Sequence, residues 1–384
     1  MNISIIGAST TKFGELWGVS PRALAREAVL GALKDAGVEA RHIQALFVGN
    51  MLSGMLGGQE HLGAFFAEEL GLPHAAAFKI EGACASGGIA VHTAVVAILS
   101  GQYETVAVLG VEKMTDHKPE DVATALMGAG SSEERAAGCT LPGLYALLAR
   151  AHMEKYGTTE EYLAAVAVKN HYHASLNPHA QFHRPITIEA VLKSHRVADP
   201  LKLLDCSPIS DGASALIISR KKESGKRKKE IQIVASAVVT DTLGLAQRES
   251  LTELKATKDA AARVYTQSGI EAKDIDVVEV HDCFTIAEIL ALEDLGITEK
   301  GDAAERIGRG EFTVGSASCT TVNPSGGLKG CGHAIGATGV KQIVELVEQL
   351  RGVAGKRQVE DARVGLAHNV GGTGGTAVVH ILKR

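Results

Sequence analysis

One stretch organises the chain, Phe78-Lys-Ile-Glu-Gly-Ala-Cys84-Ala-Ser-Gly-Gly88, which continues into the Ala-rich segment 89–101. The residues before the first glycine predict a short buried strand, and the aliphatic residues that follow the glycine pair predict a helix. Cys84 would then lie at a helix N-terminus, where unpaired N–H groups and the helix dipole favour a thiolate and could hold an oxyanion. This pattern predicts a nucleophile. The alternative is a buried, inert cysteine.

Length and composition limit the class of protein. The chain has 384 residues, enough for two core units or one duplicated unit, and its 43 glycines suit an α/β protein with many tight turns. A formal net charge of −5 provides no general attraction to nucleic acid or to an acidic membrane surface. We see no signal-peptide pattern and no apolar run near the roughly 20 residues of a membrane span, so we expect a cytoplasmic protein without a membrane segment.

Six cysteines are scattered along the sequence without a C-x-x-C spacing. In a chain of this size, such spacing indicates reduced thiols rather than a disulfide framework or a zinc site. We therefore expect no disulfide and no bound metal.

The pattern of the first part of the chain returns in the last part. Both copies show a strand, a helix that ends at glycine, the sequence Glu-Ala followed by a basic residue, and another strand. Later in both copies a glycine turn leads into a helix. The repeated segments are 3–8 with 231–236, 32–43 with 264–275, and 86–101 with 336–352. Two such halves predict related α/β layers packed around shared central helices, with the glycine turns near their junction.

Residues 115–208 do not repeat, and they contain two helical stretches, 142–155 and 159–173. We expect an insertion that lies over the active site. The predicted units of the chain are 1–114, 115–208, 209–230 and 231–384.

Two polar segments have alternative interpretations. The histidines of the insertion (His171, His173, His179 and His183) could suggest a metal site, but neither Cys nor a carboxylate completes a ligand set, so we expect a solvent-exposed polar loop. The basic segment 220–230 is interpreted as a solvated linker, and phosphate binding is the weaker alternative.

Three polar clusters follow predicted strands of the second half. They are His281-Asp-Cys283-Phe284, the segment 323–339 that contains His333, and the segment 368–375. A single histidine after a strand is usually structural. Because the three clusters occupy corresponding turns of a duplicated fold, we expect them to face Cys84.

Taken together, these motifs resemble the thiolase family from end to end, in particular the archaeal acetoacetyl-CoA thiolases and the sterol-carrier-protein-type thiolases. The resemblance implies a duplicated, five-layered αβαβα fold with an inserted loop domain. It implies acetyl-CoA C-acetyltransferase activity, which is the Claisen condensation of two acetyl-CoA or the reverse thiolytic cleavage, with a place in the mevalonate pathway. Coenzyme A thioesters would be the substrates, without a permanently bound cofactor.

The resemblance also implies roles for individual residues. Cys84 resembles the acyl-accepting nucleophile, and His333 the histidine that assists it and binds a thioester oxygen. His281 resembles a second donor to that oxygen. Gly371 resembles the residue whose N–H, with that of Cys84, holds the acyl-enzyme oxygen. Asn323 is expected beside the substrate.

The chain departs from the commoner thiolase pattern near its C-terminus, where Asn369 takes the place of a second catalytic cysteine and is also expected near the substrate. An amide cannot act as the base that a Claisen condensation requires. The related branch suggests Cys283 for this role, and Cys331, beside Gly332 and His333, is the rival.

Other functions stay open at this point. A ketoacyl synthase shares the fold but needs no base, which would make Cys283 superfluous. A hydroxymethylglutaryl-CoA synthase would require a glutamate near Cys84, and Glu81 has no supporting motif. A thiolase acting on another 3-oxoacyl-CoA, such as an aroyl-succinyl-CoA, and a non-catalytic scaffold or lipid-binding relative are further alternatives.

The resemblance also implies partners. We expect a homodimer or a tetramer. A small zinc-containing protein and a hydroxymethylglutaryl-CoA synthase are possible partners.

Overall fold

The computed structural model describes residues 3–220, 230–318 and 320–384. Their main sheet has ten strands in the order β10-β9-β11-β12-β8-β1-β7-β4-β2-β3. The two halves join where β1 pairs with β8 at Ser4–Gln232 and Ile5–Ile231. Read outward from this junction, the orders are β1-β7-β4-β2-β3 and β8-β12-β11-β9-β10, so each strand has a counterpart. The bounds are β1 (Ser4–Thr10), β2 (Ala45–Gly49), β3 (Ala76–Ile80), β4 (Thr105–Glu112), β7 (Gly212–Ser219), β8 (Ile231–Thr240), β9 (Val277–Glu279), β10 (Thr321–Val322), β11 (Val364–Gly371) and β12 (Thr376–Lys383).

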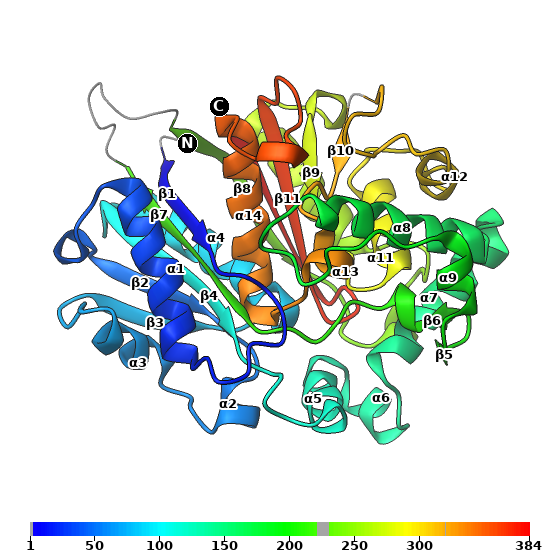
Figure 1. The fold of residues 1–384 in the computed structure, drawn as a ribbon, viewed down its shortest axis with the longest axis horizontal. Coiled ribbons are helices and arrows are strands. Elements are labelled where there is room, and N and C mark those ends of the chain that lie inside the picture. The colour runs from blue at the N-terminus through cyan, green and yellow to red at the C-terminus, as the bar shows by residue number, and fades with distance from the viewer. Residues whose placement is uncertain (1–2, 221–229, 319) are drawn as a thin grey trace.

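Helices complete a five-layered αβαβα arrangement, as predicted. On the outer face of the first half lie α1 (Pro21–Ala36) and α3 (Leu62–Glu69), and on that of the second half lie α10 (Lys255–Ser268) and α11 (Thr285–Asp294). The central layer consists of α4 (Ser86–Leu99) and α14 (Ile335–Arg351), whose apolar residues form one core with both halves of the sheet. Figure 1 shows α14 in the middle of the molecule, between the blue and the red-to-yellow halves.

The internal repeat predicted from the sequence is confirmed in detail. Ser20 caps α1 by accepting a hydrogen bond from Ala23 N, and both α1 and α10 end at a left-handed glycine, Gly37 (φ 59°) and Gly269 (φ 68°). Glycine is favoured there because other residues incur a steric penalty at positive φ. A short 3₁₀ turn follows each helix, at Ala40–His42 and Ala272–Asp274.

The central helices touch at their first turns, where only glycine fits. A Cβ atom added to Gly339 would lie 2.2 Å from Gly88 N, and one added to Gly87 would lie 2.7 Å from Gly336 O. These glycines let the two backbones meet directly. The residue that precedes α4 and the residue that precedes α14 are thereby placed near each other.

Strand β3 differs from the prediction of a buried strand. It pairs only with β2 and lies at the edge of the sheet, and Phe78 is 42% exposed. The aliphatic pattern gave no indication of this because an edge strand and a central strand of a parallel sheet can have similar compositions.

The segment 115–208 folds mostly as helices, and α7 and α8 match the two predicted stretches closely. Its elements are α5 (Pro119–Leu126), α6 (Ser132–Ala136), α7 (Leu141–Tyr156), α8 (Glu160–Ser175), α9 (Ile188–Lys193), β5 (Arg196–Ala198) and β6 (Leu201–Lys202). The remaining α-helices described are α2 (Ser53–Gly57), α12 (Ala303–Gly308) and α13 (Gly327–Cys331). None of the described helices has the length and apolar character needed to cross a bilayer.

The predicted exposure of the histidines in this segment is wrong for two of them. His171 and His173 lie on α8 and are buried, because α8 packs against α13 and α12. His173 Nδ1 donates to Asn323 O at 2.9 Å, and its Nε2 accepts from Val314 N at 2.9 Å. These bonds make His173 a core residue rather than part of a polar loop. The predicted linker 220–230 lies almost entirely outside the described residues, at 221–229.

The glycine contact between the central helices gives a testable consequence for stability. Replacing Gly339 by Ala would place a methyl group against the Gly88 backbone, and overpacking of this kind costs about 1–3 kcal/mol of the free energy of unfolding. Urea unfolding should show this loss for Gly339→Ala. Gly57→Ala serves as the control, since nothing lies within 4 Å of the added atom. Equal stability of the two variants would contradict the proposed contact.

Candidate active site

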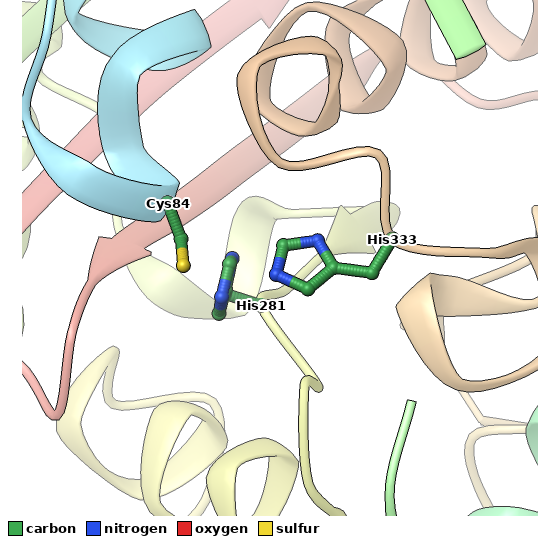
Figure 2. Close-up of side chains that lie close together, drawn as sticks. All are labelled: Cys84, His281 and His333. Atoms are coloured by element: carbon green, nitrogen blue, oxygen red, sulfur yellow. The ribbon is translucent and has the colours of Figure 1, made fainter. Parts of the chain in front are cut away.

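Three polar side chains converge beside the central helices. Cys84 comes from the 3₁₀ turn Ala83–Ala85 that precedes α4, His281 follows β9, and His333 precedes α14. One donor atom of each lies within 4.8 Å of the others, and the two imidazole rings meet edge to face with centroids 5.1 Å apart. All three are buried, and Figure 2 shows the thiol and both rings gathered in one space. The sequence prediction that these residues face one another is confirmed.

A strained turn presents Cys84. Ala83 has φ 53°, in the left-handed region that non-glycine residues rarely occupy. The Ser86 hydroxyl holds the turn by donating to Ala83 O at 2.6 Å and accepting from Gly82 N at 3.0 Å. A side chain at Gly82 would collide with Ile89 Cδ1, at 2.1 Å from its Cβ. The strand therefore turns sharply into the helix with the cysteine at the bend.

The predicted stabilisation of a Cys84 thiolate is wrong for the resting site. Burial raises the pKa of Cys84 to about 12, and the charge of Glu112 adds to this effect. The N–H groups of Gly372 and of Cys84 itself lower the pKa, but they do not compensate for the loss of water. Cys84 is thus a neutral thiol near pH 7, and it requires a base before it can attack.

His333 can provide that base. Burial lowers its pKa to about 3, so the ring is neutral. Its Nδ1 lies 2.8 Å from Thr338 Oγ1, and this hydroxyl also lies 3.1 Å from Ala334 O. With the hydroxyl donated to Ala334 O, Nδ1 holds the proton and Nε2 is free to accept one. With the hydroxyl donated to Nδ1, Nε2 holds the proton. Thr338 therefore accommodates both neutral tautomers.

His281, in contrast, is fixed in one tautomer by Asn369. Gly88 N–H donates to Asn369 Oδ1 at 3.2 Å, which orients the amide so that Nδ2 donates to Cys84 O and to His281 Nδ1, both at 3.0 Å. Since His281 Nδ1 accepts, the ring proton is on Nε2. That atom is buried and has no partner among the described residues, which leaves it free to bind a substrate oxygen.

Asn369 does not have the place expected for it. Both ends of the Asn369 amide are occupied by protein groups, so this residue orients His281 and α4 rather than binding substrate. Gly371 is the last residue of β11, where it pairs with Thr376, and it lies against the turn that carries Cys84. The N–H of the next residue, Gly372, lowers the pKa of Cys84. The role of Gly371 as an oxyanion donor stays a prediction.

Asn323 is also placed differently from the prediction. Its Oδ1 accepts from Val280 N at 2.8 Å and its Nδ2 donates to Glu288 Oε2 at 2.7 Å. The side chain is fully buried, away from the cavity beside Cys84. It fixes the end of β9, directly before His281, and so contributes to the site only through the backbone.

The two candidate acid/base cysteines lie in different places. Cys283 lines the same cavity as Cys84 and His333. Cys331 packs against Ala174 and Ala180 and lines a separate, much smaller cavity. This placement favours Cys283.

The cavity has a volume of about 200 Å³ and mostly apolar walls. The inserted segment covers it, as predicted. The apolar side chains that it provides are Ala123, Leu126, Leu141, Pro142 and Tyr145. Their hydrophobic character excludes water from the thiol, which is one reason why the pKa of Cys84 is high.

Three residues near the site were missed in the sequence. Tyr145 donates its hydroxyl to Gly372 O at 2.9 Å, and Arg248 Nη1 donates to Thr373 O at 2.5 Å, so together they fix the glycine turn after β11. Glu112 is buried beside the Cys84 turn and accepts from Gly336 N at 3.0 Å. Isolated residues of these types carry no sequence signal, because only the fold brings them to the cavity.

Comparison with known proteins agrees with this geometry. Residues 3–222 match the family described as "Thiolase, N-terminal domain", and residues 237–384 match the one described as "Thiolase C-terminal domain-like". The chain belongs to the thiolase family.

Several individual relatives cover nearly all of this thiolase. It is 48% identical to an "Acetyl-CoA acetyltransferase" from Methanothermobacter thermautotrophicus, over 100% of each chain. It is 34% identical to "Sterol carrier protein 2" from Bos taurus, over 99% of this chain and 72% of the relative. It is 37% identical to "Benzoylsuccinyl-CoA thiolase subunit BbsB" from Thauera aromatica, over 96% and 94%.

Among solved structures, the thiolase superposes on "Ltp2-ChsH2(DUF35) aldolase" with a TM-score of 0.83 at 26% identity, over 98% of this chain and 97% of the other. The shared fold extends over the whole chain rather than over one half. This agrees with the arrangement of the site, to which both halves contribute.

The thiol and two imidazoles of this thiolase are also a donor set that zinc prefers. A metal ion held by them would occupy the sulfur and both rings, which are the groups that acyl transfer requires. We therefore still predict a site without metal, because a bound ion would block the groups that react.

The hydrogen bonds of the two histidines predict their titration. Because burial lowers both pKa values far below the usual 6.5, neither ring should gain a proton between about pH 8 and pH 5. Long-range ¹H–¹⁵N spectra of histidine-labelled protein should show His281 in the Nε2–H form throughout this range. The substitution Asn369→Leu should mix the tautomers of His281 and leave the charge of His333 unchanged. A titration of either ring near pH 6.5 would contradict the proposed electrostatics.

Proposed function

We propose that this thiolase is an acetyl-CoA C-acetyltransferase, which condenses two acetyl-CoA to acetoacetyl-CoA or catalyses the reverse thiolytic cleavage. The observation that carries the proposal is the neutral Cys84 thiol beside His333, in one buried cavity with Cys283. The full-length similarity to an acetyl-CoA acetyltransferase supports the choice of substrate.

The first half of the reaction uses Cys84 and His333. His333 Nε2 takes the Cys84 proton, the sulfur attacks the thioester carbonyl carbon, and the bond from that carbon to the coenzyme A sulfur breaks. The N–H groups of Cys84 and of Gly371, which lies against the Cys84 turn, are suited to holding the oxyanion. The departing coenzyme A thiolate takes a proton from Cys283 and leaves as a thiol. Cys283 becomes a thiolate, and its charge is balanced by the imidazolium of His333.

The second half forms the carbon–carbon bond. The Cys283 thiolate removes a proton from the α-carbon of acetyl-CoA, and the electron pair of that C–H bond passes to the thioester oxygen as an enolate. His281 Nε2–H and His333 Nε2–H donate to this oxygen. The enolate attacks the acetyl carbon on Cys84, whose sulfur leaves with its electron pair and takes the proton back from His333. Cys84 and Cys283 are then both thiols again.

The alternatives receive less support from the site. Glu81 is exposed and accepts from Ala83 N at 2.6 Å, so it does not approach the cavity as the glutamate base of a hydroxymethylglutaryl-CoA synthase would. A ketoacyl synthase would leave Cys283 without a role. The apolar walls of the cavity favour a larger 3-oxoacyl-CoA substrate. The similarity to a protein named as a benzoylsuccinyl-CoA thiolase subunit also supports this alternative. A panel of acyl- and aroyl-CoA thioesters distinguishes these substrates.

Two cysteine variants test the proposed reaction. Incubation with acetyl-CoA should add an acetyl group to Cys84, detected by peptide mapping, and Cys84→Ala should abolish it. Cys283→Ala should retain this acetyl transfer, because the His333 imidazolium can protonate the departing coenzyme A instead, but it should lose α-proton exchange and condensation. Cys331→Ala is the matched control and should condense acetyl-CoA at close to the wild-type rate. Acetyl label on another cysteine would overturn the assignment of the nucleophile, and normal condensation by Cys283→Ala would overturn that of the base.

We also propose that the thiolase forms a dimer, which pairs further into a tetramer, through the edge of the sheet at β3. Phe78 on β3 and Val96 and Leu99 on the neighbouring α4 are 42%, 50% and 46% exposed. Unpaired strand edges and clustered apolar side chains are typical of protein interfaces.

Light scattering tests this surface. The wild-type protein should have at least twice the mass of its 40.1 kDa chain, and Phe78→Asp should shift the mass toward the monomer. Leu147→Asp, at another exposed apolar residue, should leave the mass unchanged. A monomeric wild-type protein, or equal effects of the two variants, would contradict the proposal.

The family resemblance further suggests a small zinc-containing partner and a hydroxymethylglutaryl-CoA synthase partner. The solved relative "Ltp2-ChsH2(DUF35) aldolase" is named for two proteins together, which supports the idea of a partner. This idea is tested by mixing the purified thiolase with each candidate partner and measuring whether a complex of larger mass forms.

A further inference from the structure

Tyr145 is a cavity-lining residue without a part in the reaction as written above. It lies on α7 of the inserted segment, is fully buried, and stacks on Phe284 with ring centroids 4.6 Å apart. Its hydroxyl donates to Gly372 O at 2.9 Å, and Tyr145 lines the same cavity as Cys283. The tyrosine therefore lies at the glycine turn after β11 and in the cavity that contains the proposed base.

A phenol has one proton and can donate it to only one of these groups at a time. While Cys283 is a thiol, its S–H can donate to the phenol oxygen, and the phenol donates to Gly372 O. When Cys283 has lost its proton, the sulfur becomes the stronger acceptor because it is charged. Rotation of the O–H bond then moves the hydrogen bond from the carbonyl to the sulfur without any transfer of the proton.

We propose that Tyr145 is a positioning residue for carbon–carbon bond formation, which holds the Cys283 thiolate by an O–H···S hydrogen bond and holds the Gly372 peptide when Cys283 is protonated. The inference rests on the proposed role of Cys283 as the base. It assigns to the inserted segment a part in the chemistry, in addition to covering the cavity.

The proton balance shows where the tyrosine acts. The thiolate forms when coenzyme A leaves with the Cys283 proton, and it disappears when the α-carbon proton moves to the sulfur. Between these events the buried sulfur has a full negative charge. Tyr145 neither gives up nor gains a proton, and burial raises its own pKa well above 10.

The electrostatics of Cys283 agree with this role. Burial raises the pKa of the Cys283 thiol well above its usual value, and the hydrogen bond from Tyr145 is the largest of the effects that lower it. Cys283 is 6% exposed and faces a cavity with mostly apolar walls, so few polar groups can take the place of this donor. Removal of the hydroxyl should therefore reduce the fraction of Cys283 that reacts as a base.

The variant Tyr145→Phe removes the hydroxyl and retains the ring that stacks on Phe284. Acetylation of Cys84 should change by less than about threefold, whereas α-proton exchange and condensation should fall by about 10- to 100-fold, as expected for loss of a hydrogen bond to a charged group. In a Cys84→Ala background, the alkylation rate of Cys283 by iodoacetamide should rise at higher pH in the tyrosine variant. A structural role alone would not move this pH dependence.

A matched control is available outside the cavity. Tyr265 is another largely buried tyrosine that donates to a backbone carbonyl, Leu295 O, at 2.7 Å. Tyr265→Phe removes the same kind of hydrogen bond and should leave both half-reactions and the alkylation profile unchanged.

The outcomes separate this inference from the proposed function. Suppose that Cys283→Ala does not condense acetyl-CoA, so that the proposed base is correct. The inference about Tyr145 is then overturned if Tyr145→Phe condenses at the normal rate and the pH dependence of Cys283 alkylation is unchanged. Equal losses in both half-reactions would place the effect at the Gly372 peptide and also overturn it. If Cys283→Ala condenses normally, the proposed base is wrong, and the inference is overturned with it.

Discussion

The contact between the first turns of α4 and α14 is the constraint on which the site depends. Gly87 and Gly339 permit this contact, because a Cβ atom on either would lie within 3 Å of the backbone of the other helix, at Gly336 O and Gly88 N. Cys84 lies just before α4 and His333 lies just before α14. The contact between the first turns of these helices therefore brings Cys84 of one half to His333 of the other. The gene duplication that the two halves suggest thus provides both the proposed nucleophile and its proposed base, one from each copy.

Burial determines the electrostatics of the cavity. It raises the pKa of Cys84 and Cys283 and lowers that of His281 and His333, so these four groups are all neutral in the resting site. The chemistry then depends on where each proton lies rather than on fixed charges. Asn369 fixes the tautomer of His281 as an oxygen donor. Thr338 can accept from His333 Nδ1 throughout, which leaves Nε2 to take a proton in one step and to donate in the next. In the proposed reaction each negative charge forms together with the positive charge on His333, which limits the free-energy cost of charge in a buried cavity.

A buried polar network attaches the inserted segment to the catalytic loops. On α8, Asn170 Nδ2 donates to Asp282 at 2.6 Å and to Glu288 at 2.8 Å, and Lys169 pairs with Glu288 at 3.0 Å. Asp282 is the residue between His281 and Cys283, so the position of the insertion and the geometry of the site are coupled. This coupling explains why two polar residues of α8 that sequence composition would place in solvent are buried.

The sequence by itself determined the fold and indicated the residues that the structure brings together at the candidate active site. The repeated glycine stops predicted the duplication, and the ordered motifs around Cys84, His281 and His333 indicated a thiolase, because such signals are local in the chain. Cys283 was suggested by the related branch of the family, once it was clear that Asn369 cannot act as a base.

Only the tertiary structure decided properties that depend on surroundings. The protonation of Cys84 is set by desolvation from distant residues, and the burial of His171 and His173 follows from the packing of α8. Tyr145 and Arg248 reach the glycine turn from positions 227 and 125 residues away in sequence. A local sequence pattern cannot contain such information. These properties depend on which surfaces of the chain are buried together after folding.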